Sequence, residues 1–297
     1  MSEANPNLKE RVRAFWQANP CGTKFSDAPP GTRLFFERVA AHRYATEWHI
    51  PLAADFAAAR DRRVLEIGCG LGTDGAEFAR AGADYTGVDL TDAAVDLARR
   101  NFAWQELPGN FGTADAENLD FPSDSFDIVY SHGVLHHTPD TAGAVREVHR
   151  VLRPGGRALV MLYHRDSYNY RIGINVLRRA GTHLLKSDLG LKLIHLVTGE
   201  SMTSLQEHAR LLQQERENYL AADEFLSQNT DGAGNPLARV YTRTEARELF
   251  KDFAKVEVRT YFLHKRWLPV IGAVLPRSLE SWLASRWGWH LWIYATK

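Results

Sequence analysis

The sequence predicts an α/β fold built on a doubly wound, mostly parallel sheet. Short apolar runs alternate with helical segments from residue 61 onward, which is the pattern of successive βαβ units. The first apolar run also leads through a glycine-rich loop into a helix, as Gly68-Cys69-Gly70-Leu71-Gly72. Such sheets are covered by helices on both faces and bind ligands beyond the carboxyl ends of their strands. We therefore expect the functional site at that edge.

The elements before the sheet are helical. Residues 8–19 and 32–59 show helical spacing of apolar side chains, and the link between them is rich in Pro and Gly. The sheet region alternates five strand-like runs with three helices, in the order 64–67, 73–81, 85–89, 92–103, 112–115, 126–130, 140–152 and 157–163. Residues 152–156, Leu-Arg-Pro-Gly-Gly, predict a type II turn, and two last strands follow at 256–262 and 291–295.

Composition restricts the class of protein. The 297 residues are 44% hydrophobic and 24% charged, which is typical of a folded globular chain. Lys and Arg number 36, as do Asp and Glu, so the chain is neither wholly basic, as many nucleic-acid-binding proteins are, nor acidic. Two cysteines exclude a disulfide framework, and the histidines lack zinc-binding spacing, so we expect no metal. Because the start is not leader-like and no apolar run approaches about 18 residues, we expect a cytoplasmic protein.

The spacing of the glycine loop distinguishes between ligands. A dinucleotide fingerprint would have its third glycine at position 73, which is Thr73, whereas the loop reads G-x-G-x-G. Asp89 ends the next strand and is placed to accept hydrogen bonds from a ribose diol, and Asp115 ends the third strand, where an adenine amine is its expected partner. Residues 61–149 contain 6 basic and 16 acidic side chains, a balance that repels phosphates and suits a cationic ligand.

Several motifs resemble the class I S-adenosylmethionine-dependent methyltransferases, especially the broad group that contains quinone and small-metabolite methyltransferases. Between residues 62 and 163 they are the glycine loop, Gly87-Val88-Asp89, Asp115-Ala116-Glu117-Asn118-Leu119, Phe126-Asp127-Ile128-Val129, Val134-Leu135-His136-His137 and Leu152-Arg153-Pro154-Gly155-Gly156. The resemblance implies a Rossmann-like, seven-stranded sheet whose last two strands form an antiparallel edge hairpin. It also implies S-adenosylmethionine as the cofactor, S-adenosylhomocysteine as its product, and a lid of N-terminal helices.

The resemblance carries roles onto individual residues. The glycine loop would line the methionine part of the cofactor, Asp89 would bind the ribose and Asp115 would bind adenine. Two residues at the end of the fourth strand would lie near the sulfonium, and Cys69 is expected to pack. The complete predicted cofactor set is Glu66, Gly68, Cys69, Gly70, Gly72, Asp89, Leu90, Asp115, Ala116, Ser131 and His132.

Methyl transfer from a sulfonium is an in-line displacement. It needs alignment of the acceptor, and it needs a base only if the acceptor arrives protonated. The histidines after the fourth strand and the Tyr-His pair after the fifth lie at the edge where acceptor and methyl group would meet. The candidate catalytic residues are His132, His136, His137, Tyr163 and His164. The alternative for His136 and His137 is that they pack or orient their loop.

The family pattern assigns no role to the segment after the fifth strand. We predict three parts: an N-terminal lid at 1–60, a cofactor-binding core at 61–163 and 251–297, and an acceptor-binding insertion at 164–250. Arg239 follows a polar, turn-rich run that is typical of an ordinary surface loop, and the alternative is that Arg239 clamps a carboxylate or phosphate of the acceptor. The candidate acceptor-binding residues are Tyr44, Tyr170, Arg239 and Tyr241.

These observations favour a methyltransferase that acts on O, N or S of a small polar metabolite. The alternative is a C- or O-methyltransferase of a quinone or lipid at a membrane surface, supported by the 9 basic and 2 acidic residues of 150–199 and by tryptophans near the end of the chain. A third alternative is a non-catalytic cofactor-binding module. We expect a small-molecule acceptor, with neither nucleic acid nor a membrane as partner, and the oligomeric state stays open.

Overall fold

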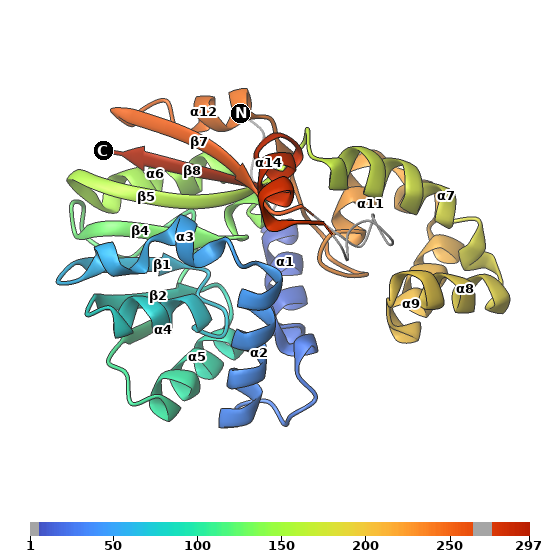
Figure 1. Cartoon of the computed structure of the whole chain (residues 1–297), viewed down its shortest axis with the longest axis horizontal. Coiled ribbons are helices and arrows are strands. Elements are labelled where there is room, and N and C mark those ends of the chain that lie inside the picture. The colour runs from blue at the N-terminus through green and yellow to red at the C-terminus, as the bar shows by residue number, and fades with distance from the viewer. Residues whose placement is uncertain (1–5, 264–274) are drawn as a thin grey trace. The chain divides into compact units, whose positions relative to one another are not determined.

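The chain divides into two compact units. Unit 1 comprises Met1–Leu162, Arg243–Arg259 and Trp292–Lys297, and unit 2 comprises Tyr163–Thr242 and Thr260–Leu291. A computed structural model describes residues 6–263 and 275–297 (Figure 1). The predicted segments 1–60 and 251–297 therefore extend into residues that lie outside the described part.

The sheet confirms the predicted doubly wound α/β fold. Its strands follow the spatial order β3-β2-β1-β4-β5-β8-β7, and an eighth, short strand, β6, pairs with the end of β5 (Figure 1). Neighbours from β3 through β5 are parallel. The order of the strands along the chain reverses between β1 and β4, which is where sheets of this class bind ligands. The strands are β1 (Arg63–Ile67), β2 (Asp84–Asp89), β3 (Asn110–Thr113), β4 (Phe126–His132), β5 (Leu152–His164), β6 (Val240–Tyr241), β7 (Lys255–Tyr261) and β8 (His290–Thr296).

The last strand runs antiparallel to its neighbour, as expected. At one end of β5, Gly155 donates its amide to the carbonyl of Lys297 (3.0 Å), and at the other end His164 donates to the carbonyl of Trp289 (2.9 Å). Residue numbers thus rise along β5 while they fall along β8. Because β8 lies between β5 and β7, the edge strand is β7, and the segment between the two last strands includes α14 (Arg277–Trp287).

Three helices of unit 1 begin at a capping side chain, and the first is capped by Thr32, which accepts a hydrogen bond from the amide of Phe35 (3.3 Å). Thr91 accepts a hydrogen bond from the amide of Ala94, and Asp140 accepts one from the amide of Gly143 (2.9 Å). α5 packs on β2 and β3 and α4 packs on β2, whereas α1 and α2 contact α5, and α6 lies further along the sheet (Figure 1). The helical elements are α1 (Pro6–Ala18), η1 (Thr23–Phe25), α2 (Arg33–Thr46), α3 (Ile50–Ala54), η2 (Phe56–Ala59), α4 (Thr73–Arg80), α5 (Asp92–Trp104), η3 (Leu135–His137), α6 (Thr141–Val151) and α12 (Arg243–Leu249).

The prediction of a single helix over 32–59 is wrong. α2 ends at Thr46, α3 begins at Ile50 with Pro51 in its first turn, and Asp55 then has a φ of 48°. Proline lacks the amide that a continuous helix needs, and a residue in the left-handed conformation ends a helix. These two residues override the helix-favouring alanines around them.

Two further boundaries differ from the prediction. β3 ends two residues before Asp115, which lies in the following turn and bridges to Asn118. The residues predicted as a turn, 152–156, form the start of β5, although Gly155 keeps the positive φ (77°) that a type II turn requires. The backbone of Lys297 forms hydrogen bonds with this segment, so residues that favour a turn become part of the sheet.

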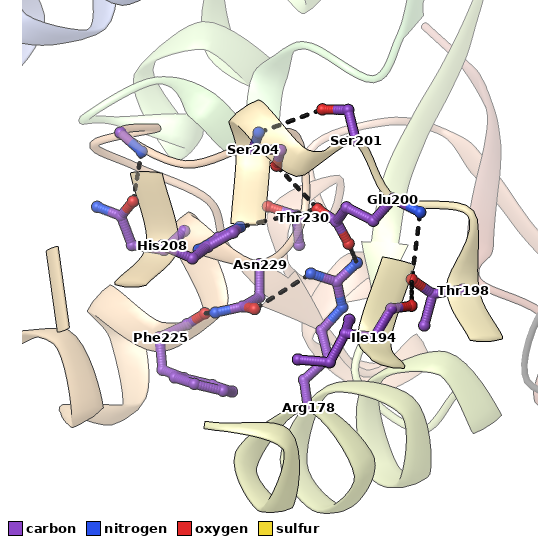
Figure 2. A network of polar contacts seen from close by, with 12 residues as sticks. Arg178, Ile194, Thr198, Glu200, Ser201, Ser204, His208, Phe225, Asn229 and Thr230 are labelled. Carbon is purple, nitrogen blue, oxygen red and sulfur yellow. Dashed lines mark hydrogen bonds and ion pairs between the residues drawn. The ribbon is translucent and has the colours of Figure 1, made fainter. Parts of the chain in front are cut away.

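Unit 2 contains the helical insertion predicted after the fifth strand. A polar network joins its helices (Figure 2): Arg178 donates to Oδ1 of Asn229 and pairs with Glu200, each at 3.2 Å. Glu200 also accepts from the hydroxyl of Ser204 (2.9 Å), so one carboxylate links two helices. The helical elements of the unit are η4 (Asn169–Arg178, a π-helix), α7 (Arg179–Gly181), η5 (Leu184–Lys186), α8 (Asp188–Thr198), α9 (Met202–Gln214), α10 (Arg216–Leu220), α11 (Ala222–Gln228) and α14.

The extent of unit 2 does not coincide with the predicted insertion at 164–250. The chain returns to unit 1 at Arg243 and enters unit 2 again at Thr260. Within the described ranges, no helix combines the length and the apolar character that crossing a bilayer requires.

A tyrosine of β2 packs against two glycines in the core of unit 1. The hydroxyl of Tyr85 donates to Glu66 at 2.5 Å, and both side chains are buried. A Cβ on Gly75 of α4 would lie 2.2 Å from this hydroxyl oxygen, and a Cβ on Gly87 would lie 2.6 Å from it. The close packing of α4 on β2 therefore depends on the missing side chains.

We expect Gly75→Ala to destabilise unit 1 by about 1–3 kcal/mol, because the added methyl group must displace a packed ring. The change in free energy of unfolding is measured by urea titration. Gly112→Ala is the matched control, since a Cβ there would meet no atom within 4 Å. Equal stability of the two variants would contradict this account of the packing.

Candidate active site

The glycine loop is held against the end of β2. The amides of Gly68 and Cys69 both donate to the carbonyl of Val88, at 2.7 and 2.9 Å. Gly68 has a φ of 77°, and a Cβ there would lie 2.2 Å from Val134, so both its conformation and its surroundings require glycine. Gly70 has a φ of 52°, and a Cβ there would meet nothing within 4 Å. The loop is thus packed at its start and open at its centre.

Asp89 lies at the end of β2, next to this open centre. Its Oδ2 accepts the amide of Gly70 at 3.1 Å, and its Oδ1 accepts the amide and the hydroxyl of Thr91, at 3.0 and 2.9 Å. Burial raises the pKa of Asp89, and these donors partly oppose the increase. Oδ1 thus already accepts two hydrogen bonds, while Oδ2 retains a lone pair that is able to accept a further hydrogen bond from a hydroxyl of a diol.

Asp115 lies beside α1. The amine of Lys9 is 2.6 Å from Oδ2 of Asp115 and 2.5 Å from Oε2 of Glu117. Burial opposes the charge of Lys9, but the two carboxylates raise its pKa. The turn after β3 is also joined to β2, because the amide of Ala114 donates to the carbonyl of Asp89 (2.8 Å). The predicted ribose and adenine contacts are therefore neighbours, with an N-terminal helix bound to the second.

Glu66 and Cys69 are buried. Burial, and then the charge of Asp74, raises the pKa of Glu66 well above its usual range, and Oε2 of Glu66 accepts a hydrogen bond from the hydroxyl of Tyr85. Burial also raises the pKa of the Cys69 thiol, as expected for a packing residue.

The site contains a buried carboxylate that the sequence analysis does not predict. Asp74, in the first turn of α4, accepts hydrogen bonds from Nε (2.9 Å) and Nη2 of Arg43, from Tyr44 (3.0 Å) and from Tyr130 (2.8 Å). Burial alone would raise the pKa of Asp74, but Arg43, with smaller contributions from His132 and Tyr130, lowers it to about 2. Asp74 follows the glycine loop directly, so a signal exists in the sequence, but its partners come from distant segments.

His132 ends β4 beside this network. Its Nδ1 lies 3.2 Å from Nη2 of Arg43, and its Nε2 lies 4.0 Å from Oε2 of Glu47. Burial, and then the charge of Arg43, lowers the pKa of His132 well below its usual range, so the ring is neutral at pH 7. The preceding Ser131 is fully buried and donates to the carbonyl of Ile67 (3.0 Å), which joins β4 to β1.

The other two candidate histidines of unit 1 are buried in η3. The rings of His136 and His137 are 4.3 Å apart, and Trp16 of α1 lies edge-on to His137 at 5.4 Å. This packing fits the alternative in which they orient the loop. Tyr44, a candidate for acceptor binding, uses its hydroxyl on Asp74.

The remaining candidates belong to unit 2. Tyr163 stacks on Trp289 at 4.3 Å and donates its hydroxyl to Asp231 (2.8 Å). Nδ1 of the buried His164 lies 2.9 Å from the carbonyl oxygen of Gly288. The pairing of β5 with β6 brings two candidates together, because His164 is opposite Tyr241. Arg239 precedes β6 and Tyr170 lies in η4, and both are partly buried.

A groove of about 620 Å³ lies elsewhere on unit 1, between α2, α4 and α5. Four of its charged side chains pair within their own helices, Arg33 with Glu37 and Arg80 with Glu77. Of the described residues that line it, none belongs to the predicted cofactor set. The groove is therefore distinct from the site at the glycine loop.

The chain is similar to known methyltransferases over this region. Residues 65–160 match the methyltransferase domain family. A ubiquinone biosynthesis O-methyltransferase from Alkalilimnicola ehrlichii is 33% identical over 130 residues, which are 42% of this chain and 53% of that protein. A phthiotriol/phenolphthiotriol dimycocerosates methyltransferase from Mycobacterium ulcerans is 40% identical over 121 residues, which are 40% of each chain. The chain thus covers about half or less of these relatives.

The fold also matches solved structures. The PH0226 protein from Pyrococcus horikoshii has a TM-score of 0.52 at 16% identity, over 96% of this chain and 98% of that one. The sheet and the glycine loop that follows its first strand belong to the Rossmann-like class of α/β folds. Residues 65–160 are a methyltransferase domain of the class I, S-adenosylmethionine-dependent type.

We expect Asp89→Ala to weaken S-adenosylhomocysteine binding by about 1–3 kcal/mol, because hydrogen bonds to a charged group are lost. Isothermal titration calorimetry measures the difference. Asp84→Ala, at the exposed start of the same strand, is the matched control and leaves the affinity unchanged. Unchanged binding in a folded Asp89→Ala protein, or tighter binding of NAD than of S-adenosylhomocysteine, would refute the assignment of this residue.

Proposed function

We propose that the chain is a methyltransferase that transfers a methyl group from S-adenosylmethionine to O, N or S of a small polar metabolite. The observation that carries the proposal is the pairing of Asp89 with the open centre of the glycine loop, joined by the hydrogen bond from the amide of Gly70. A carboxylate that accepts a diol, next to backbone without a side chain, suits a nucleoside whose remaining part lies along the loop.

The described residues fit this cofactor. Asp89 would hold the ribose and Gly68 to Gly72 the methionine part, while the acidic side chains of this region suit a cation. When bound, S-adenosylmethionine supplies an electrophilic methyl group on a positively charged sulfur. The chain itself has to align the acceptor, exclude water and take up a proton if the acceptor carries one.

The candidate histidines differ in their ability to take up that proton. A carbonyl oxygen only accepts, so the contact of His164 with Gly288 places the ring proton on Nδ1, while Nε2 lies 4.0 Å from Oδ2 of Asp166. His164 is therefore our candidate for a general base. Arg239 and Tyr241 would bind the acceptor, as the sequence analysis expects.

The direct test measures S-adenosylhomocysteine formation by mass spectrometry with a panel of one catechol, one thiol, one primary amine and one carboxylic acid. The proposal expects turnover with at least one of them. Tight cofactor binding without turnover of any acceptor would favour the non-catalytic module.

If the acceptor carries an anion, we expect Arg239→Ala to raise its KM by about tenfold or more, because a charge-assisted hydrogen bond is lost. Affinity for S-adenosylhomocysteine should change little. Arg210→Ala, on an exposed arginine of α9, is the matched control. An equal loss of cofactor and acceptor affinity would assign Arg239 to the cofactor site instead.

One observation favours the second candidate, a quinone or lipid methyltransferase at a membrane surface. α8 exposes Leu189, Leu193, Leu196 and Val197 by 80%, 48%, 81% and 64%, and these four residues share one helical face. The exposed Lys192 borders the face. An apolar stripe with a cation at its margin is typical of helices that lie on anionic membranes.

Sedimentation with liposomes of phosphatidylcholine and phosphatidylglycerol separates the two candidates. At about 0.15 M salt, where weak attraction is screened beyond about 8 Å, the first candidate expects the protein to stay in the supernatant. The second expects sedimentation that is lost in the triple variant Leu189→Gln, Leu193→Gln, Leu196→Gln, since glutamine keeps the helix propensity of leucine. Leu52→Gln, which changes an exposed leucine of α3, is the control.

A further inference from the structure

The contacts of His132 determine which of its nitrogens carries a proton. Arg43 has only N–H groups to offer and has no acceptor, so its Nη2, 3.2 Å from Nδ1 of His132, donates to a lone pair on that nitrogen. In a neutral ring the proton is then on Nε2. Oε2 of Glu47 is 4.0 Å from Nε2, too far for a hydrogen bond, but its negative charge favours a proton on the same nitrogen.

The guanidinium is not free to turn away from His132. Its Nε and Nη2 donate to the two oxygens of Asp74, and its Nη1 faces Glu47 at 3.6 Å. Nη2 has two hydrogens, so it serves Asp74 and His132 together. Asp74 is in turn held by the hydroxyls of Tyr44 and Tyr130. A chain of hydrogen bonds thus runs from the buried carboxylate through Arg43 to the imidazole.

We propose that Arg43 is a positioning residue that fixes His132 as the neutral Nε2–H tautomer, so that His132 offers a hydrogen-bond donor to the methyl acceptor and does not act as a general base. The role toward the acceptor rests on the proposed methyltransferase function, whereas the tautomer does not. An N–H donor orients an acceptor oxygen through one lone pair and leaves another lone pair for attack on the methyl group.

Burial and the charge of Arg43 favour the neutral ring of His132. A proton on Nδ1 would point at the guanidinium of Arg43, and His49 adds a further repulsion if charged, while Asp74 acts in the opposite direction. The ring also lies near the aromatic side chains of Tyr130 and Trp292, at centroid distances of 6.4 and 5.3 Å. We therefore expect no change of protonation between about pH 5.5 and 8, where an ordinary histidine titrates.

Nuclear magnetic resonance of the 15N-labelled full chain tests the tautomer without a substitution. Long-range 1H–15N correlations distinguish a protonated from an unprotonated ring nitrogen, and His132→Gln assigns the signals. The proposal expects an unprotonated Nδ1 and a protonated Nε2, with constant shifts from pH 5.5 to 8, with and without S-adenosylhomocysteine. A protonated Nδ1, or titration of His132 within that range, would overturn it.

A charge-balanced variant tests the role of Arg43. Arg43→Met alone leaves Asp74 as an uncompensated buried charge, so it is combined with Asp74→Asn. In the folded double variant we expect both tautomers of His132 to be populated. Arg38→Met, on an exposed residue of the same helix that pairs with Asp27, is the control and keeps the wild-type tautomer. An unchanged tautomer in the double variant would show that Arg43 is not the positioning residue.

Kinetics with the acceptor of the panel that turns over fastest test the role of His132. Glutamine retains an N–H donor but takes up no proton, so kcat of His132→Gln should lie between that of wild type and that of His132→Leu, which loses the donor. Loss of a general base costs on the order of 10²- to 10⁴-fold. If both variants lose that much, His132 is the base and the proposal fails. If no acceptor turns over, the proposed function fails, while the resonance experiment still decides the tautomer.

Discussion

The buried carboxylate of Asp74 is the interaction on which the candidate site depends. Its four hydrogen bonds come from two residues of α2 and one residue of β4, and Asp74 itself begins α4. A single charged group therefore joins an N-terminal helix, a central strand and the helix that follows the glycine loop. Removing one donor would leave part of the charge of Asp74 uncompensated in a place that water does not reach. Because an uncompensated buried charge destabilises the folded state, such a network is stable only when all its hydrogen bonds are made.

The parts of the candidate site that sequence reasoning predicts are those with a local signal. The G-x-G-x-G spacing after an apolar run indicates an open loop at the end of β1, and the position of Asp89 at the next strand end follows from the alternation of strands and helices. Both signals span about twenty residues, because a βαβ unit places its first loop and second strand side by side whatever the rest of the chain does.

The parts that it misses depend on contacts between distant segments. Arg43 and Asp74 are 31 positions apart, Arg43 and His132 are 89 apart, and Lys9 and Asp115 are 106 apart. In the sequence, Arg43 is one more cation on a helix, and nothing local marks it as a partner of a histidine. The same holds for α8, whose leucines suggest a core helix until its burial is known.

The place of β8 in the sheet has a consequence for how the chain folds while it is synthesised on the ribosome. Lys297, just after this strand, donates a hydrogen bond to the carbonyl of Leu152, which is 145 positions earlier in the chain. In the sheet, β8 lies between β5 and β7. Strands β1 to β5 are therefore made and able to pair long before their last neighbour emerges, and during that time β5 presents an open edge with unpaired amides and carbonyls. Open edges recruit other chains, so slow synthesis of the segment between β5 and β8 would favour aggregation.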